Sequence, residues 1–344
     1  MRILHLLNSD RFSGAENVVC QIARMLEKEP NIEVLYCSRD GQIREALEER
    51  RITFVPLEAM SAQDVKRVIR DYKPDVIHAH DMRAGFVAAR VCGRIPLISH
   101  IHNNAYDSRG LSLKSIAYLL AARKAKHIFW VSKSAYEGYF FHRLFRKKSE
   151  ILYNIIDIDA LYEKMRTDQK RYDYDVVYVG RLTYPKNPQR LLRVFSKVAE
   201  RLPTVKLAIV GSGEMEEEVK ALCDHMNLQD RVHFLGFQTN PLKILHDSKV
   251  MVMTSRWEGT PMCALEAMAL GVPIVSTPVD GLTDLIKNGK NGYLSDDDDA
   301  LAEQIVAILT NKDYADKLSA EMIRISKYIN LVEKYRKAIF DSYS

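Results

Sequence analysis

The chain is organised around residues 253–278, MTSRWEGTPMCALEAMALGVPIVSTP. The apolar run at 250–253 predicts a short buried strand that leads into this stretch. Residues 255–259, SRWEG, interrupt the run with polar side chains and a glycine, and therefore predict a loop. A buried strand followed by such a loop is typical of the strand-to-helix connections of α/β proteins.

A helix is expected to begin directly after this loop. Thr260 is a favourable N-cap residue, and Pro261 suits the first helical position because its missing N–H is not needed there. Gly271 is placed to end the helix, and 272–276 resumes as a strand. The order of strand, loop, helix and strand produces a helix N-terminus that can bind an anion.

Two glutamates lie eight residues apart in this stretch, Glu258 in the loop and Glu266 about one turn into the helix. Glu258 could meet a group just outside the helix N-terminus, and Glu266 could bond hydroxyl groups along the helix flank. Taken alone, the two glutamates are better explained by a solvated helix whose N-terminal acid is stabilised by the helix dipole.

A similar strand-to-helix loop, GRLTYPKN, occupies 180–187 and opens at Gly180. Arginine offers a planar fork for phosphate oxygens, and lysine offers a mobile point charge. Arg181 and Lys186 could therefore hold a pyrophosphate from two sides. Either residue alone would usually be a surface charge.

A third strand-to-helix loop, GSGEME at 211–216, carries half of a dinucleotide-binding fingerprint. Gly211 and Gly213 match its first two glycines, but Glu216 stands where the third should be, and further glutamates follow. The sequence therefore disfavours an NAD-dependent dehydrogenase.

Residues 258–275, EGTPMCALEAMALGVPIV, closely resemble the E-x7-E signature of the retaining glycosyltransferases of family 4, which have the GT-B fold. The resemblance implies that Glu258 bonds hydroxyls of the donor sugar and that Glu266 bonds the ribose of the nucleotide. Pro261 departs from the Gly-x-Gly of many relatives and removes one backbone N–H. The residues implied near the sugar and phosphate are Gly259, Thr260, Pro261 and Met262.

The same resemblance covers nearly the whole chain and assigns the pyrophosphate to Arg181 and Lys186. At Gly14, where Ser13 replaces the first glycine of the Gly-Gly-Ala-Glu of relatives, a purely structural turn is equally consistent with the sequence. The further donor-binding positions that the resemblance implies are Gly14, Gly180, Gly211, Gly213 and Phe237.

Four histidines, His78, His80, His100 and His102, are expected where two strands of the first half end. Ligands bind at this edge of open α/β sheets. The two His-x-His pairs suggest a metal site, but no carboxylate constellation accompanies them, so a histidine that meets a sugar hydroxyl fits better than zinc. By resemblance this histidine is His102, with amides of the asparagines at 103–104 nearby.

Strand-like segments alternate with helical ones along the chain, which predicts βαβ units and an α/β fold with parallel sheets. A length of 344 residues suits two domains. We expect GT-B architecture, with a Rossmann-like acceptor-binding domain at 1–165 facing a Rossmann-like nucleotide-sugar-binding domain at 166–325 across a cleft. By resemblance, a C-terminal helix at 326–344 crosses back to the first domain. The polar segment 160–172 is interpreted as the linker, and one helix is expected at 133–143.

The composition describes a globular protein with a net charge of +5 and no apolar run near the roughly 20 residues that cross a bilayer. The first residues become polar too soon for a signal peptide. The five cysteines are odd in number and scattered, which indicates buried thiols in a reducing compartment. The sequence therefore predicts a cytoplasmic protein.

Positive charge concentrates at 109–148, where ten basic residues and eight aromatic residues accompany a single acid, Glu137. Such a segment can bind an anionic membrane surface or nucleic acid. A solvated helix face beside core aromatics explains the same residues. Because the resemblance implies lipid-linked acceptors, we expect a peripheral contact with the inner face of the plasma membrane, and no nucleic-acid partner.

The function that the resemblance implies is retaining transfer of a hexose or N-acetylhexosamine from a nucleotide sugar, preferably a UDP-sugar, to a glycan or polyprenyl-diphosphate-linked acceptor in capsule or exopolysaccharide synthesis. Departure of the nucleoside diphosphate develops negative charge, which cations and a helix N-terminus can stabilise. No Asp-x-Asp lies in a loop suited to magnesium, so no divalent metal and no other cofactor is expected. The catalytic positions, in transition-state and positioning roles, are Glu258, Arg181, Lys186 and His102.

Two other functions are compatible with this fold. A nucleotide-sugar epimerase of the GT-B type is disfavoured by the E-x7-E signature and by the G-R-L-x3-K motif. A catalytically silent scaffold in a glycan assembly complex is disfavoured because all the expected polar groups are present.

Overall fold

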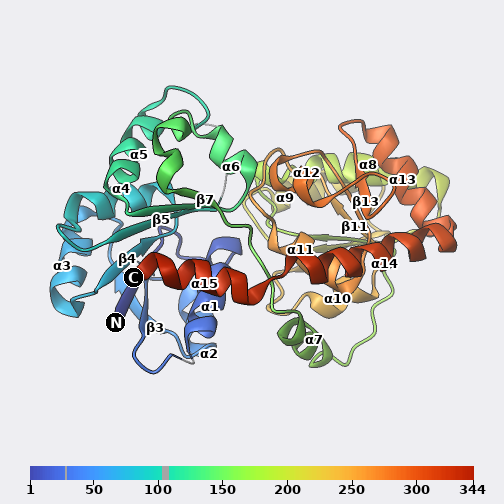
Figure 1. Ribbon diagram of the computed structural model, residues 1–344. Coiled ribbons are helices and arrows are strands. Elements are labelled where there is room, and N and C mark those ends of the chain that lie inside the picture. The colour runs from blue at the N-terminus through green and yellow to red at the C-terminus, as the bar shows by residue number, and fades with distance from the viewer. Residues whose placement is uncertain (28, 103–107) are drawn as a thin grey trace. The chain divides into compact units, whose positions relative to one another are not determined.

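The computed structural model describes residues 1–27, 29–102 and 108–344 (Figure 1). The chain forms two compact units. The first contains Met1–Asn154 and Val332–Ser344, and the second contains Ile155–Leu331. Each unit has its own parallel sheet and its own hydrophobic core.

The first unit is built on seven parallel strands in the order β3-β2-β1-β4-β5-β6-β7. Its strands are β1 (Arg2–Leu6), β2 (Glu33–Arg39), β3 (Thr53–Leu57), β4 (Val76–Ala79), β5 (Leu97–Ile101), β6 (His127–Trp130) and β7 (Ser149–Ile151). Its helices are α1 (Gly14–Leu26), α2 (Ile43–Glu49), α3 (Ala62–Tyr72), α4 (Met82–Val91), α5 (Leu113–Lys124), α6 (Lys133–Gly138), the 3-10 helix η2 (His142–Lys148) and α15 (Val332–Tyr343). The main core lies between the sheet and the helices α3 to α6, and a smaller cluster lies under α1 and α2.

The second unit has six parallel strands in the order β10-β9-β8-β11-β12-β13. Its strands are β8 (Val176–Val179), β9 (Leu207–Val210), β10 (Val232–Gly236), β11 (Val250–Met253), β12 (Ile274–Ser276) and β13 (Gly292–Leu294). Its helices are α7 (Ile158–Arg166), the 3-10 helix η3 (Tyr184–Lys186), α8 (Pro188–Arg201), α9 (Glu216–His225), α10 (Leu242–Asp247), α11 (Met262–Leu270), α12 (Asp280–Leu285), α13 (Asp298–Thr310) and α14 (Lys312–Ile329). In both units the strand order reverses beside the first strand, which is the point near which open α/β sheets bind ligands.

The helix of the central stretch, α11, begins one residue later than the sequence predicts. Pro261 is its N-cap, in an extended conformation with ψ 124°, and Met262 is the first helical residue. Thr260 is therefore not the cap. Gly271 ends the helix in the left-handed conformation, with φ 71°, as expected.

Two further expectations about local structure are wrong. The segment 160–172 is not simply a linker, because α7 runs through its first half, is capped by the Asp157 side chain, and buries Leu161 and Met165. The helix expected at 133–143 ends at Gly138 and is followed by the separate turn η2.

The C-terminal segment contains two helices that belong to different units. The helix α14 ends at Ile329 in the second unit, and α15 packs beside α1 in the first unit. The return of the last helix to the first unit was predicted, although it begins at Val332 rather than at 326.

Candidate functional site

The carboxyl ends of β8, β9 and β11 lie side by side in the second sheet, and their three following loops carry most of the predicted donor-binding residues. The loop after β9 packs directly on the loop after β8. A Cβ atom at Gly211 would lie 2.0 Å from the carbonyl oxygen of Gly180, and one at Gly213 would lie 2.2 Å from that of Leu182. Since no side chain fits in such gaps, glycine is required for the two loops to meet.

Lys186 and Glu258 form an ion pair between the loops that follow β8 and β11. The Lys186 Nζ lies 2.6 and 2.7 Å from the two carboxylate oxygens of Glu258. The Ser255 hydroxyl donates to the same carboxylate at 2.6 Å. The backbone N–H of Glu258 donates to Asp280 Oδ2 at 2.7 Å. Glu258 is buried, so Lys186 and Ser255 compensate a carboxylate charge that would otherwise be costly to bury.

The loop after β8 is held in a conformation that presents Lys186. Asn187 adopts the left-handed conformation, with φ 52°. Its carbonyl oxygen accepts from Thr254 Oγ1 at 3.0 Å, and its side-chain oxygen accepts from Arg256 Nη2 at 3.1 Å. The Arg256 backbone N–H also donates to the carbonyl oxygen of Pro185 at 2.7 Å. These bonds fix the loop after β11 against the loop after β8.

The start of α11 is packed against α12. The N–H of Gly281 donates to the carbonyl oxygen of Gly259 at 3.1 Å, and a Cβ at Gly281 would lie 2.2 Å from that oxygen. Thr260 and Met262 are buried here. Glu266 lies half-buried on α11, and desolvation raises the pKa of its carboxyl group, while the charge of Lys164 opposes this rise.

Arg181 and Phe237 present exposed side chains from loops at the same sheet edge. Arg181 follows β8, and among the described residues its guanidinium has no ion-pair partner. Phe237 follows β10 and is 59% exposed. The structure therefore gathers the predicted residues of the second unit around one edge, where the side chains of Lys186 and Glu258 contact each other.

His102 and Gly14 belong to the first unit. Gly14 is the first residue of α1 and is exposed. His102 follows β5 directly, and its Nε2 lies 2.9 Å from Nδ1 of His80. The asparagines at 103–104, which were expected near the sugar, lie outside the described residues.

His102 is the last member of a cluster of five histidines on one face of the first sheet. The Nε2 of His80 lies 2.8 Å from Nδ1 of His5. Burial lowers the pKa of His5 and His102 to about 3. Burial also lowers the pKa values of the other three well below 6.5. The members of this histidine cluster are His5, His78, His80, His100 and His102.

The histidine cluster contains two groups whose ring nitrogens lie close enough to share a metal ion, with all ligand atoms within 4.8 Å of one another. Neutral imidazole is the form that binds metals. The groups are His5, His78 and His80, and His80, His100 and His102.

Two family models match the chain in succession. The model of glycosyltransferase family 4 matches residues 12–160, and that of glycosyl transferases group 1 matches residues 163–325. The chain belongs to the group 1 and family 4 glycosyltransferases.

Known members of this glycosyltransferase family resemble the chain along different lengths. An uncharacterized glycosyltransferase of Methanocaldococcus jannaschii is 31% identical to the chain. The matched region covers 62% of the chain and 58% of that relative. The UDP-Gal:alpha-D-GlcNAc-diphosphoundecaprenol alpha-1,3-galactosyltransferase of Escherichia coli is 27% identical over 91% of the chain and 89% of its own length.

Among solved structures, Anabaena HepE in complex with UDP-glucose superposes with a TM-score of 0.87, at 22% identity and over 99% of both chains. This likeness concerns the fold. Both sheets of the chain, with seven and six parallel strands, therefore have the GT-B type of architecture expected for the glycosyltransferase family.

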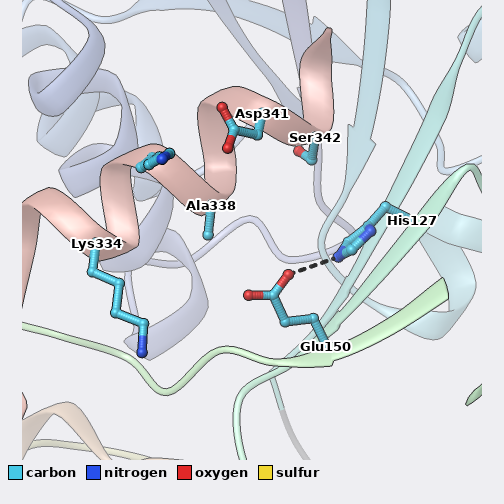
Figure 2. Close-up of a pocket in the computed structure, with 7 residues that line it drawn as sticks. His127, Glu150, Lys334, Ala338, Asp341 and Ser342 are labelled. Atoms are coloured by element: carbon cyan, nitrogen blue, oxygen red, sulfur yellow. Dashed lines mark hydrogen bonds and ion pairs between the residues drawn. The ribbon is translucent and has the colours of Figure 1, made fainter. Parts of the chain in front are cut away.

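A separate hollow in the first unit of this glycosyltransferase contains none of the predicted site residues. Figure 2 shows it between α15 and the strands β6 and β7, of which β7 is the edge of the sheet. Its volume is about 330 Å³. His127 and Glu150 lie 3.2 Å apart in it, and burial lowers the pKa of His127 against the opposing effect of Glu150. The residues that line it are His127, Glu150, Lys334, Lys337, Ala338, Asp341 and Ser342.

Three residues of these sites were not found from the sequence. Ser255 and Asp280 hold Glu258, but a serine in a loop and an aspartate in a turn carry no distinctive pattern. His5 joins the histidine cluster because it stands directly opposite His78 in the register of β1 and β4. Its position in the strand-like run RILHLL was the only available signal.

Proposed function

We propose that the protein transfers a hexose or N-acetylhexosamine from a nucleotide sugar, preferably a UDP-sugar, to a glycan acceptor during cell-surface polysaccharide synthesis. The observation that carries this proposal is the Lys186–Glu258 ion pair at the edge of the second sheet. The E. coli relative, named for UDP-galactose and a diphosphoundecaprenol acceptor, supports a UDP-sugar and a lipid-linked acceptor.

The roles of the charged residues follow from their contacts. The Lys186 ammonium has three N–H donors, so it can keep a bond to Glu258 and still reach a phosphate oxygen. The exposed Arg181 supplies a planar fork for the same diphosphate. The carboxylate of Glu258, oriented by Ser255 and Asp280, can accept from hydroxyls of the donor sugar.

The remaining roles are assigned by the family resemblance. Glu266 lies half-buried on the flank of α11, where it can accept from the hydroxyls of a ribose. His102 in the first unit meets the donor sugar. The loops that begin at Gly180 and Gly211 and the exposed ring of Phe237 enclose the nucleotide.

The proposed reaction retains the configuration of the donor sugar and requires no divalent metal. Negative charge on the departing diphosphate is stabilised by Arg181, Lys186 and the N-terminus of α11. The donor phosphate itself takes the proton of the acceptor, as the family resemblance implies, so no side chain is assigned as a base.

The test is release of UDP or GDP from a panel of nucleotide sugars, with and without a chelator, by the wild type and by Glu258→Gln. We expect release from one donor, unchanged by the chelator and lowered at least about hundredfold in the variant. Release that disappears in the chelator would refute the metal-free reaction. An α-configured product from an α-configured donor, read by NMR, tests retention. A wild type that neither binds nor cleaves any donor would instead favour the silent scaffold.

We also propose that residues 109–148 attach the protein to an anionic membrane surface. The structure corrects one basis of this expectation, because the aromatic residues Tyr118, Trp130 and Tyr139 are buried in the core. The exposed apolar side chains are aliphatic ones, together with a phenylalanine. They are Leu111, Leu113, Ile116, Leu120, Phe140 and Leu144.

Exposed basic residues accompany these apolar side chains, since Arg143, Arg146 and Lys147 flank Leu144 on η2. Apolar insertion together with attraction to acidic lipid headgroups is the usual basis of peripheral binding. None of the described helices is long and apolar enough to cross a bilayer.

A vesicle sedimentation assay tests the membrane proposal with vesicles that contain anionic phosphatidylglycerol. Leu144→Ser and Arg146→Glu together should release most of the bound protein. Tyr328→Ser in the second unit, where the side chain is 78% exposed, is the matched control and should bind as the wild type does. Equal binding by neutral and anionic vesicles would contradict the electrostatic part of the proposal.

A further inference from the structure

Two aromatic side chains stand beside the Lys186–Glu258 ion pair, on the two loops that form it. Tyr184 lies two residues before Lys186 in the loop after β8, and Trp257 directly precedes Glu258 in the loop after β11. The centroids of the two rings are 5.9 Å apart, and their planes are inclined at 58°. The side chains of the ion pair are only 19% and 8% exposed, whereas Tyr184 is 57% exposed. The aromatic pair therefore offers an apolar surface to solvent next to a polar site.

The aromatic pair is held in place by contacts between the two loops. The Arg256 guanidinium lies over the Tyr184 ring, 4.4 Å from its centroid. The same side chain donates from Nε to the carbonyl oxygen of Tyr184 at 3.3 Å, and from Nη2 to Asn187 Oδ1 at 3.1 Å. The backbone N–H of Arg256 donates to the carbonyl oxygen of Pro185 at 2.7 Å. Because the loops are joined in advance, ordering the rings adds little to the entropic cost of binding a ligand.

The aromatic pair combines apolar surface with a polar donor, which suits a sugar ring. A pyranose presents C–H groups on its faces and hydroxyl groups at its edge, so aromatic rings pack on the faces and hydrogen-bonding groups meet the edge. Trp257 is half-buried, and its indole N–H has no hydrogen-bond partner among the described residues. This N–H is not one of their buried unpartnered atoms, so it can donate to a hydroxyl group.

The proposed reaction requires the acceptor to lie beside the donor diphosphate. The bond between the donor sugar and the diphosphate breaks as the bond from that sugar to the acceptor oxygen forms, and the acceptor proton passes to the diphosphate. The acceptor hydroxyl must therefore approach on the side of the departing diphosphate. In the proposed function Arg181 and Lys186 bind this diphosphate from the loop at 180–187. Tyr184 is exposed on the same loop.

We propose that Tyr184 and Trp257 are the contribution of the second unit to the acceptor site, where they pack on the pyranose ring that receives the transferred sugar. This inference rests on the proposed function and adds a subsite to it. The buried side chains of Lys186 and Glu258 serve the donor, and the exposed rings beside them serve the acceptor. The indole N–H of Trp257 bonds a hydroxyl at the edge of the acceptor ring.

The emission of Trp257 tests occupancy of this subsite in the full-length protein. Trp257 is one of two tryptophans, and the other, Trp130, is completely buried in the first unit, so acrylamide quenches mainly Trp257. The protein is saturated with UDP and titrated with the methyl α-glycosides of glucose, galactose and N-acetylglucosamine. We expect at least one glycoside to protect Trp257 from quenching, with saturation in the millimolar range. A UDP-sugar without glycoside should protect Trp257 no more than UDP does.

The same glycosides serve as surrogate acceptors in a kinetic test with the donor that the wild type cleaves. The measured quantity is the ratio of transfer to the glycoside over hydrolysis of the donor. Tyr184→Leu and Trp257→Leu should each lower this ratio about tenfold, through a higher KM for the glycoside. Tyr184→Phe keeps the ring and should retain the ratio, and Trp257→Phe, which lacks the N–H, should recover part of it. Tyr328→Leu, at a 78% exposed position on α14, is the matched control and should keep the wild-type ratio.

Three results would overturn the acceptor subsite alone. The first is a wild type in which no glycoside both protects Trp257 and receives the sugar. The second is protection by a UDP-sugar equal to that by a glycoside, which would assign the rings to the donor sugar. The third is an unchanged ratio of transfer to hydrolysis in both leucine variants. A wild type that neither binds UDP nor cleaves a nucleotide sugar would instead overturn the proposed function, and the inference with it.

Discussion

Each of the two sheets buries polar groups near the carboxyl ends of its strands. The two sheets differ in whether the buried groups carry a charge. In the second unit the buried group is a charge, the carboxylate of Glu258, which is balanced by Lys186 and accepts a further hydrogen bond from the Ser255 hydroxyl. In the first unit the buried groups are four histidines, His5, His78, His80 and His100, which remain neutral. Two similar topologies therefore support an ionic site and an uncharged one.

The difference predicts which perturbation each region tolerates. An ion pair fails when one partner is removed, because the remaining charge stays buried without compensation. A neutral imidazole cluster tolerates the loss of one ring better, but it is sensitive to acid, because the unfolded chain takes up protons that the folded cluster excludes.

The largest effect is expected from Lys186→Met, which removes the cation of the ionic site. Turnover of the donor should fall by about hundredfold or more, because the charge that stabilises the leaving diphosphate is lost. The free energy of unfolding should also fall, by roughly 3–5 kcal/mol, because the buried carboxylate of Glu258 loses its cation. Steady-state kinetics and urea unfolding measure the two effects.

Two variants separate these effects of Lys186. The double variant Lys186→Met/Glu258→Gln should recover most of the stability but none of the turnover. Lys197→Met is the matched control, since Lys197 pairs with Asp299 at the same 2.6 Å but on the exposed surface of α8. A control that is as unstable as Lys186→Met would show that burial is not what distinguishes the ionic site.

The next effect concerns the backbone that supports the ionic site. Gly213→Ala should lower the free energy of unfolding by about 3 kcal/mol, because its Cβ would overlap the carbonyl oxygen of Leu182. It should also weaken nucleotide binding, since the loops after β8 and β9 must separate. Gly110→Ala, where the new Cβ meets nothing within 4 Å, is the control. Calorimetric titration with UDP and thermal unfolding compare the two, and equal stability would contradict this account of the loops.

Acid should affect the first unit through the histidine cluster. The pKa of His5 and His102 is about 3 in the folded protein and 6.5 in the unfolded chain. Between these values the unfolded chain binds more protons, so stability is complete above pH 6.5 and decreases as the pH falls towards 3. Each such histidine contributes a slope of at most about 1.4 kcal/mol per pH unit.

The variant His100→Phe measures one such contribution. Burial also lowers the pKa of His100 well below 6.5, so the unfolded chain binds one proton there that the folded protein excludes. Its replacement should therefore reduce the slope of stability against pH between pH 6.5 and about 5 by up to about 1.4 kcal/mol per pH unit. An unaltered slope in His100→Phe would mean that this ring is protonated in the folded protein.

The sequence predicts the two regions to different extents. Glu258 and Lys186 were named because they match the E-x7-E and G-R-L-x3-K motifs of the family that the sequence resembles, and the three glycine-bearing loops were predicted because each lies between a strand-like and a helical segment. The contact between Lys186 and Glu258 was not found, since 72 residues separate them and only the order of the strands brings β8 beside β11. His5 was missed for the same reason, because strand register is a property of the folded sheet.

Local boundaries were missed where one residue decides them. Proline at 261 was expected inside the helix, but the structure uses it as the cap. The polar segment at 160–172 lacks a strong periodicity, yet α7 forms there because Asp157 caps it and two apolar side chains face the core. Capping and burial of this kind depend on the tertiary environment more than on helix propensity.

The smallest effect is expected where α15 meets the histidine cluster. The Tyr343 hydroxyl and Nδ1 of His78 are hydrogen-bonded at 2.8 Å, while the buried Tyr335 hydroxyl on the same helix has no partner among the described residues. Tyr343→Phe should therefore lower the free energy of unfolding by about 1 kcal/mol, and Tyr335→Phe should leave it unchanged or raise it slightly. The two variants lose the same atom from the same helix, so their difference in urea unfolding isolates the bond to His78. An equal loss of unfolding free energy in both variants would mean that the hydrogen bond between Tyr343 and His78 does not stabilise the protein.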